Sequence, residues 1–157
     1  MAMVEAYCFG AGHLHMRSIV IHLADTTREA VRTQLSEIAE YTSGDEWRYP
    51  HRSSAPVLYI QFYDDYEREV EPGEMNSLAS ELDQMPSVSI IAHVSGRVPG
   101  GAEVRWFTES VLGTFRGLAQ DEYSPHYWTV AEIRSQAIAH GHPFFDYEGW
   151  HENTPAV

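Results

Sequence analysis

The chain has 157 residues, of which 43% are apolar and 12% aromatic, and its 23 acidic side chains outnumber its 10 basic ones. This length and apolar content suit a single folded domain and exclude a disordered chain. The net charge of −13 argues against nucleic acid and anionic membranes as partners and favours a basic protein. All ten basic residues are arginine, which excludes chemistry that needs a lysine amine.

Two features indicate a cytoplasmic protein. The single cysteine, Cys8, cannot form an internal disulfide, as is typical of a reducing compartment. No apolar run approaches the ~20 residues that span a bilayer, and the N-terminus lacks the basic and apolar regions of a secretion signal. We expect one domain over residues 1–157, with 1–15 as an extension or extra strand and 143–157 as a tail packed on the domain.

The hydrophobic pattern predicts the elements of an α+β fold. Strands are expected where apolar and polar residues alternate, over residues 17–24, 57–63, 88–95 and 102–107. Helices are expected where apolar residues recur every three or four positions, over residues 27–42, 73–84, 108–118 and 129–140. The stretch between the first helix and the second strand, residues 45–56, reads as a polar loop.

Local signals mark helix starts and one turn. Capping boxes pair Thr26 with Glu29 and Thr129 with Glu132, and Pro72 suits the first turn of another helix. The glycine-containing segment 98–101 is expected to close a hairpin, so it presents no helix N-terminus to a phosphate. Together the elements predict a two-layer sandwich, ferredoxin-like or related. Its mixed sheet has about four to five strands, and the helices lie mainly on one face.

Two pairs of histidines have a spacing that suits a metal, namely His13 with His15 and His140 with His142. A zinc site needs at least three converging protein ligands, and the sequence supplies no evident third ligand. We therefore expect no metal and no cofactor. The sequence also lacks a serine nucleophile elbow, and we assign no catalytic residue.

An acidic stretch begins at Asp64, Asp65 and Glu67 and continues to Glu74. It lacks the glycine and the spacing of a calcium-binding loop. One interpretation is a solvated loop whose last carboxylates favour the N-terminus of the following helix. The other is an acidic patch for a basic partner.

The C-terminal third combines aromatic rings with carboxylates, which suits a surface that binds arginine- and lysine-rich proteins. The candidate contact residues there are Asp121, Glu122, Tyr123, Tyr127, Trp128, Asp146 and Trp150. The alternative is that these rings close the edge of the core while the acids face water.

A second candidate site is the polar face of the predicted sheet. Its residues alternate away from the apolar face and form a set typical of pockets and interfaces. They are His22, Tyr59, Gln61, Tyr63, His93 and Arg105. A sheet back covered by the C-terminal segment is the competing interpretation.

Residues 117–123 and 128–133, followed by the run Phe144 to Tyr147, resemble segments of small acidic immunity proteins that are encoded beside bacterial toxins. The resemblance lies in the C-terminal third of the chain. It implies an inhibitor that binds and neutralises a basic toxin or nuclease-like enzyme. Two rival hypotheses remain: a small-molecule-binding or enzymatic domain that uses the polar sheet face, and a homodimer that hides this face.

Overall fold

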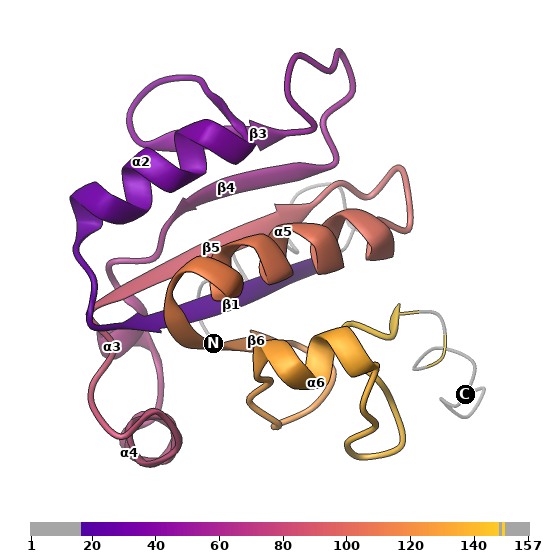
Figure 1. Ribbon diagram of the computed structural model, residues 1–157. Coiled ribbons are helices and arrows are strands. Elements are labelled where there is room, and N and C mark those ends of the chain that lie inside the picture. The colour runs from indigo at the N-terminus through magenta and orange to yellow at the C-terminus, as the bar shows by residue number, and fades with distance from the viewer. Residues whose placement is uncertain (1–16, 148, 150–157) are drawn as a thin grey trace.

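The computed structural model describes residues 17–147 and 149, and these residues form an α+β fold around one open sheet (Figure 1). The strands are β1 (Arg17–Ala24), β2 (Glu40–Tyr41), β3 (Glu46–Tyr49), β4 (Leu58–Phe62), β5 (Val88–Val94) and β6 (Arg116–Asp121). The helices are α2 (Arg28–Ile38), α3 (Tyr66–Glu69), α4 (Pro72–Leu82), α5 (Gly101–Thr114) and α6 (Val130–Ser135). The strand order is β2-β3-β4-β5-β1-β6. Every pairing is antiparallel, so the prediction of a mixed sheet was wrong.

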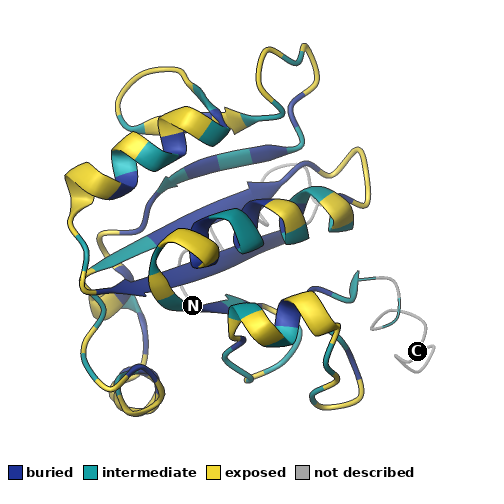
Figure 2. Cartoon of the chain, in the orientation of Figure 1, coloured by how far each residue is buried: buried dark blue, intermediate teal, exposed yellow. Residues whose placement is uncertain are grey.

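Helices cover both faces of the sheet. Strand β1, which lies between β5 and the edge strand β6, is buried along its whole length and is dark blue in Figure 2. Its side chains Ile19 and Ile21 join the larger core, which contains residues of α2, α5 and α6. Val20 and Ala24 point to the other face and join a smaller core with α3 and α4. The helix predicted over 73–84 therefore lies on the other face of the sheet from α2, whereas we expected the helices mainly on one face.

The stretch 102–107, predicted as a strand, is the first half of α5. Its alternating apolar residues also satisfy a helical repeat, and the fully buried apolar side chains are Val104, Phe107 and Val111, at intervals of three and four. Trp106, which a strand would place beside Val104, is 45% exposed. The strand prediction failed because two apolar periodicities overlap in these residues.

The helix predicted over 108–118 ends at Thr114, and Leu118 belongs to the edge strand β6. This strand pairs with β1. A Cβ on Gly117 would lie 2.4 Å from the backbone oxygen of His22, so the two strands can approach this closely only because the residue is glycine. Helical spacing alone did not reveal this non-local pairing.

The predicted polar loop 45–56 contains strand β3. Trp47 is fully buried there, its ring packs against Phe62, and its indole N–H donates to the hydroxyl of Ser36 on α2 over 3.0 Å. The preceding helix consequently ends at Ile38, and the chain enters β2, whereas the prediction continued the helix to residue 42. One buried tryptophan makes this short strand part of the sheet.

Several local predictions are confirmed. Strands β1, β4 and β5 occupy the first three predicted strands, and Pro72 begins α4. The capping box of Thr129 and Glu132 is present at α6, whereas the cap of α2 is Thr27 instead of Thr26. Helix α6 ends before the predicted boundary because Gln136 adopts a left-handed backbone with φ 55°. None of the helices in 17–147 and 149 is long and apolar enough to cross a bilayer.

Candidate functional site

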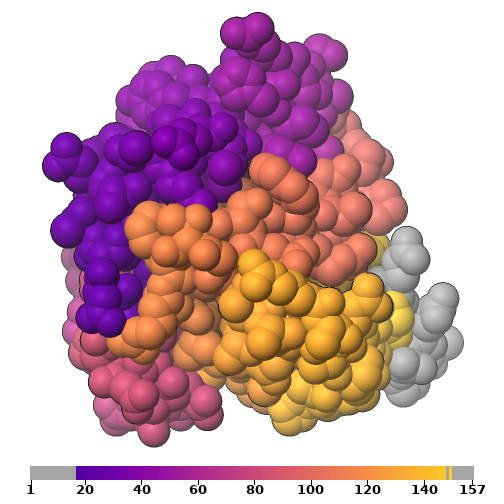
Figure 3. Space-filling view, viewed as in Figure 1, coloured from indigo at the N-terminus to yellow at the C-terminus, as the bar shows by residue number. Residues whose placement is uncertain are grey.

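Residues 64–83, which contain α3 and α4, form a segment that we call the acidic arm. It carries eight carboxylates and one arginine, and seven of these carboxylates are exposed. In the space-filling view this segment protrudes at the lower left rim of the molecule (Figure 3). More than half of the net charge of the chain is therefore displayed on one short surface segment.

Three of the eight carboxylates have partners within the described residues. Asp64 pairs with Arg28 of α2, and Asp65 pairs with Arg68. Glu69 accepts a hydrogen bond of 2.5 Å from the hydroxyl of the buried Tyr63. The other five make no ion pair with a residue that the structure describes: Glu67, Glu71, Glu74, Glu81 and Asp83.

The arm is fixed to the sheet by its apolar side. Met75, Leu78 and Leu82 of α4 are buried at the spacing of one helix face, and Tyr66 of α3 is buried beside them. Tyr127 reaches the arm from the C-terminal part of the chain and donates its hydroxyl proton to the backbone oxygen of Glu74 over 3.2 Å. Packing on one side thus leaves the charged side of α4 facing solvent.

The polar sheet face does not form the predicted pocket around His22. This side chain is fully buried beneath α3, where its ring lies 4.4 Å from the ring of Tyr66. Its two nitrogens are hydrogen bonded, one to the hydroxyl of Ser89 at 2.8 Å and the other to the side-chain oxygen of Gln120 at 3.1 Å. Burial lowers the pKa of His22 to about 4, so the imidazole is neutral at pH 7. The ring connects the sheet to the arm.

The remaining residues of that predicted set do not form one pocket, because only Tyr59 and His93 are neighbours. Tyr59 is half-buried on β4 opposite His93 of β5, and burial lowers the pKa of His93 to about 4. Tyr63 lies after β4 and belongs to the smaller core. Arg105 is on α5, against the other face of the sheet, because its segment is a helix and not a strand.

The C-terminal candidates also fall into two groups. Trp128 is 1% exposed and packs edge-on against Phe144 in the larger core, so it is not offered to a partner. Asp121 is buried, and its carboxylate accepts backbone N–H bonds from Tyr123 and Phe145 at 3.0 and 2.8 Å. Burial raises the pKa of Asp121, although these hydrogen bonds oppose the rise.

The other residues of that group are partly accessible. Glu122 is exposed, and its carboxylate accepts a bond of 3.2 Å from the backbone N–H of Ser18. Tyr123 is half-buried against Phe145. Asp146 accepts a bond of 2.8 Å from His142 if that ring nitrogen is protonated. Of the predicted loop only Tyr127 joins the acidic arm. Trp150, His13 and His15 lie outside the described residues.

The arginines divide into two groups that the sequence does not predict. Five form ion pairs with carboxylates: Arg28, Arg32, Arg68, Arg116 and Arg134. The other five make no ion pair with a described residue: Arg17, Arg48, Arg52, Arg97 and Arg105. The strand register places Arg17 and Arg48 toward the end of the sheet that contains Tyr49, Leu58 and Val94. Arg52 and Arg97 follow β3 and β5 at that end, and Arg105 lies near the start of α5; we call this region the arginine end.

Arg17 holds the loop that leads into α5. Its guanidinium is buried and donates to the backbone oxygens of Ser95, over 2.8 Å, and of Val98 and Pro99. It also lies 4.3 Å from the ring centre of Tyr147. The loop and the C-terminal segment are therefore fastened together by one cation.

That loop corrects the hairpin prediction for residues 98–101. Gly100 is the N-cap of α5 with φ 75°, and a Cβ there would lie 2.6 Å from a methyl group of Val94. No side chain caps this end of the helix. The segment thus forms the N-terminus of helix α5, and the prediction that it closes a hairpin was wrong.

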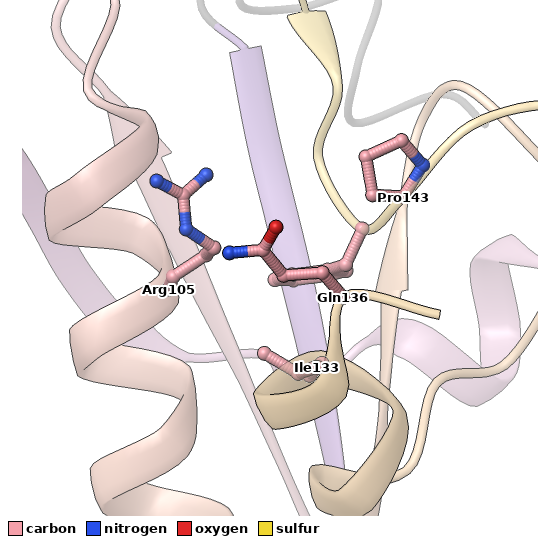
Figure 4. Close-up of a pocket in the computed structure, with 5 residues that line it drawn as sticks. Arg105, Ile133, Gln136 and Pro143 are labelled. Carbon is pink, nitrogen blue, oxygen red and sulfur yellow. The ribbon is translucent and has the colours of Figure 1, made fainter. Parts of the chain in front are cut away.

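A hollow of about 120 Å³ lies between α5, the end of α6 and the C-terminal segment (Figure 4). Its lining residues are Arg105, Ile133, Gln136, Pro143 and Phe144. Arg105 also lines a second hollow of about 260 Å³, which contains Asp146 in its wall. Among the described residues no group of three His, Cys, Asp or Glu side chains could hold a metal ion.

No protein-family model, curated protein or solved structure matches the chain. The function is therefore inferred from the surface of the protein itself.

Proposed function

We propose that the chain is an immunity-type protein that binds a basic cognate toxin or enzyme through the acidic arm and thereby neutralises it. The observation that carries the proposal is the set of five carboxylates on α3, α4 and their flanks that have no ion-pair partner among the described residues. A basic protein would supply the missing counter-charges. The resemblance of the C-terminal third to immunity proteins points in the same direction.

Packing supports this choice of surface. The apolar side of α4 is fixed on the sheet, so its carboxylates occupy defined positions before a partner arrives. A preorganised surface loses less conformational entropy on binding than a disordered acidic tail. Its field also steers a basic partner toward the arm and raises the association rate.

The rival enzymatic hypothesis loses its principal residue. His22 is fully buried and hydrogen bonded through both ring nitrogens, so no substrate can reach it without opening the arm. Of the other members of the proposed pocket, Tyr59 and His93 are cross-strand neighbours, but Tyr63 belongs to the smaller core and Arg105 lies on α5. We therefore favour protein binding over catalysis on the sheet face.

Co-expression with the product of each gene adjacent to this one tests the proposal, which requires one of these products to be a basic toxic protein. The wild-type chain should restore growth and co-purify with the toxin. A variant with Glu67, Glu71 and Glu74 changed to lysine should lose both effects. A control with Glu29, Glu37 and Glu46 changed to lysine alters the net charge equally on α2 and β3 and should still protect. Failure of the wild-type chain to protect or to bind would overturn the proposal.

A further inference from the structure

The smaller hollow beside Arg105 differs from the rest of this acidic chain. None of its lining residues is a carboxylate, and the one charged group among them is the guanidinium of Arg105. Ile133, Pro143 and Phe144 supply apolar walls. A cationic group next to apolar walls is the usual composition of a site for a small organic anion.

Arg105 shares the adjoining larger hollow with Asp146, whose carboxylate is bonded to His142. Arg105 makes no ion pair with a described residue, and the carboxylate of Glu109, one turn further along α5, lies 3.7 Å from Arg134 instead. In Figure 4 the side-chain amide of Gln136 points toward the side chain of Arg105, whose guanidinium extends along α5. The two groups together present several N–H donors to a ligand.

We infer that this hollow binds a small carboxylate with a short apolar stem. A guanidinium donates two parallel N–H bonds to a planar carboxylate, and the amide of Gln136 adds a further donor. Ile133 and Phe144 contact the stem and remove its apolar surface from water. The uncapped N-terminus of α5, one turn away from Arg105, adds a favourable potential for an anion. This site is separate from the acidic arm, and its occupation does not depend on the proposed function.

An NMR titration tests the inference directly. Butyrate is added to the full chain while the methyl signals of Ile133 and the side-chain amide of Gln136 are followed. Both should shift and saturate, and butyramide, which has the same size without the charge, should bind about tenfold more weakly or worse, because a charged hydrogen-bonded pair is lost. Inorganic phosphate, which lacks the apolar stem, should also bind more weakly than butyrate.

Variants distinguish binding of butyrate in this hollow from a general attraction of the anion to any arginine. Arg105→Ala should reduce butyrate affinity about tenfold or more, and Arg105→Lys should bind less well than the wild type because it cannot form the two parallel bonds. Arg48→Ala, which removes another arginine without an ion pair, should leave the affinity unchanged. The inference is overturned if butyrate does not saturate these signals, if butyramide or phosphate binds equally well, or if Arg105→Ala and Arg48→Ala behave alike. Unchanged spectra of the free variants would verify that they remain folded.

Discussion

The acidic arm and the arginine end lie toward opposite ends of β5 and use their charges in different ways. In the arm, the carboxylates that make no ion pair are exposed on helices whose apolar sides pack on the sheet. At the arginine end, Arg17 is buried on backbone oxygens and aromatic rings, and Arg97 donates to the backbone oxygen of Pro56 and to the hydroxyl of Ser95. A missing ion pair therefore indicates a binding surface only where the side chain has no other internal partner.

The two regions also differ in their packing. The larger core joins the sheet to α2, α5 and α6, whereas the arm contributes to the smaller core on the other face. A region with fewer buried apolar contacts opens more readily than the rest of the fold. The arm should thus be the least stable part of the described fold, while the helices of the larger core unfold with the sheet.

Two truncations should produce the largest effects and test this difference. Phe107→Ala in α5 should cost about 3–5 kcal/mol, and Leu78→Ala in α4 about 2–5 kcal/mol, because both side chains are fully buried. Denaturant unfolding measures the total loss of unfolding free energy in each variant, and hydrogen exchange shows which segments lose protection. Leu78→Ala should increase exchange mainly in residues 63–87. Equal loss of protection throughout the sheet in both variants would contradict the account.

Acid should weaken the contact between arm and sheet through His22. The pKa of this histidine is about 4 in the folded chain, against 6.5 for an ordinary histidine, so the unfolded chain binds the proton first. The contribution of the neutral His22 to the free energy of unfolding is complete above about pH 6.5. It is lost as the pH falls toward 4, and the total loss is about 3 kcal/mol. His22→Gln should reduce this pH dependence in urea unfolding. The exposed His51→Gln provides the control, and equal slopes for the two variants would exclude His22 as the cause.

The smallest expected effect concerns the ion pair at the edge of the arm. Asp64→Asn should lower stability by less than about 1 kcal/mol, because both partners are solvent-exposed. Arg28 also keeps its contacts with Asp45, at 3.5 Å, and with the ring of Phe62, at 4.0 Å. Thermal unfolding at low and high salt measures this cost. A loss of several kcal/mol would mean that the pair holds the arm on α2.

Local sequence features predicted the strands and helices whose signals do not overlap. The alternation in β4 and the capping box at Thr129 belong to single segments and were recognised correctly. Strand β3 was missed because its position depends on Trp47 packing under α2, and β6 was missed because Gly117 matters only beside β1. These contacts join residues far apart in the sequence, and no local period records them.

The candidate sites were likewise predictable where they depend on local sequence and not where they depend on contacts between distant residues. The charge of the acidic arm was predictable because its carboxylates are close in sequence and lie on short helices. The burial of Trp128 was not, since it depends on backbone bonds with Ala119 in β6. The division of the arginines was equally hidden, because pairs such as Arg116 with Asp25 connect distant segments.

The rate of association with a basic toxin found in the co-expression experiment, measured at several salt concentrations, tests the central claim most directly. At low salt, reversing Glu67, Glu71 and Glu74 should slow association by about tenfold or more. The matched charge reversal of Glu29, Glu37 and Glu46 should change this rate much less. At high salt the association rates of the wild type and the two triple variants should become similar. If both triple variants slow association equally, net charge and not the acidic arm steers the partner, and the account is contradicted.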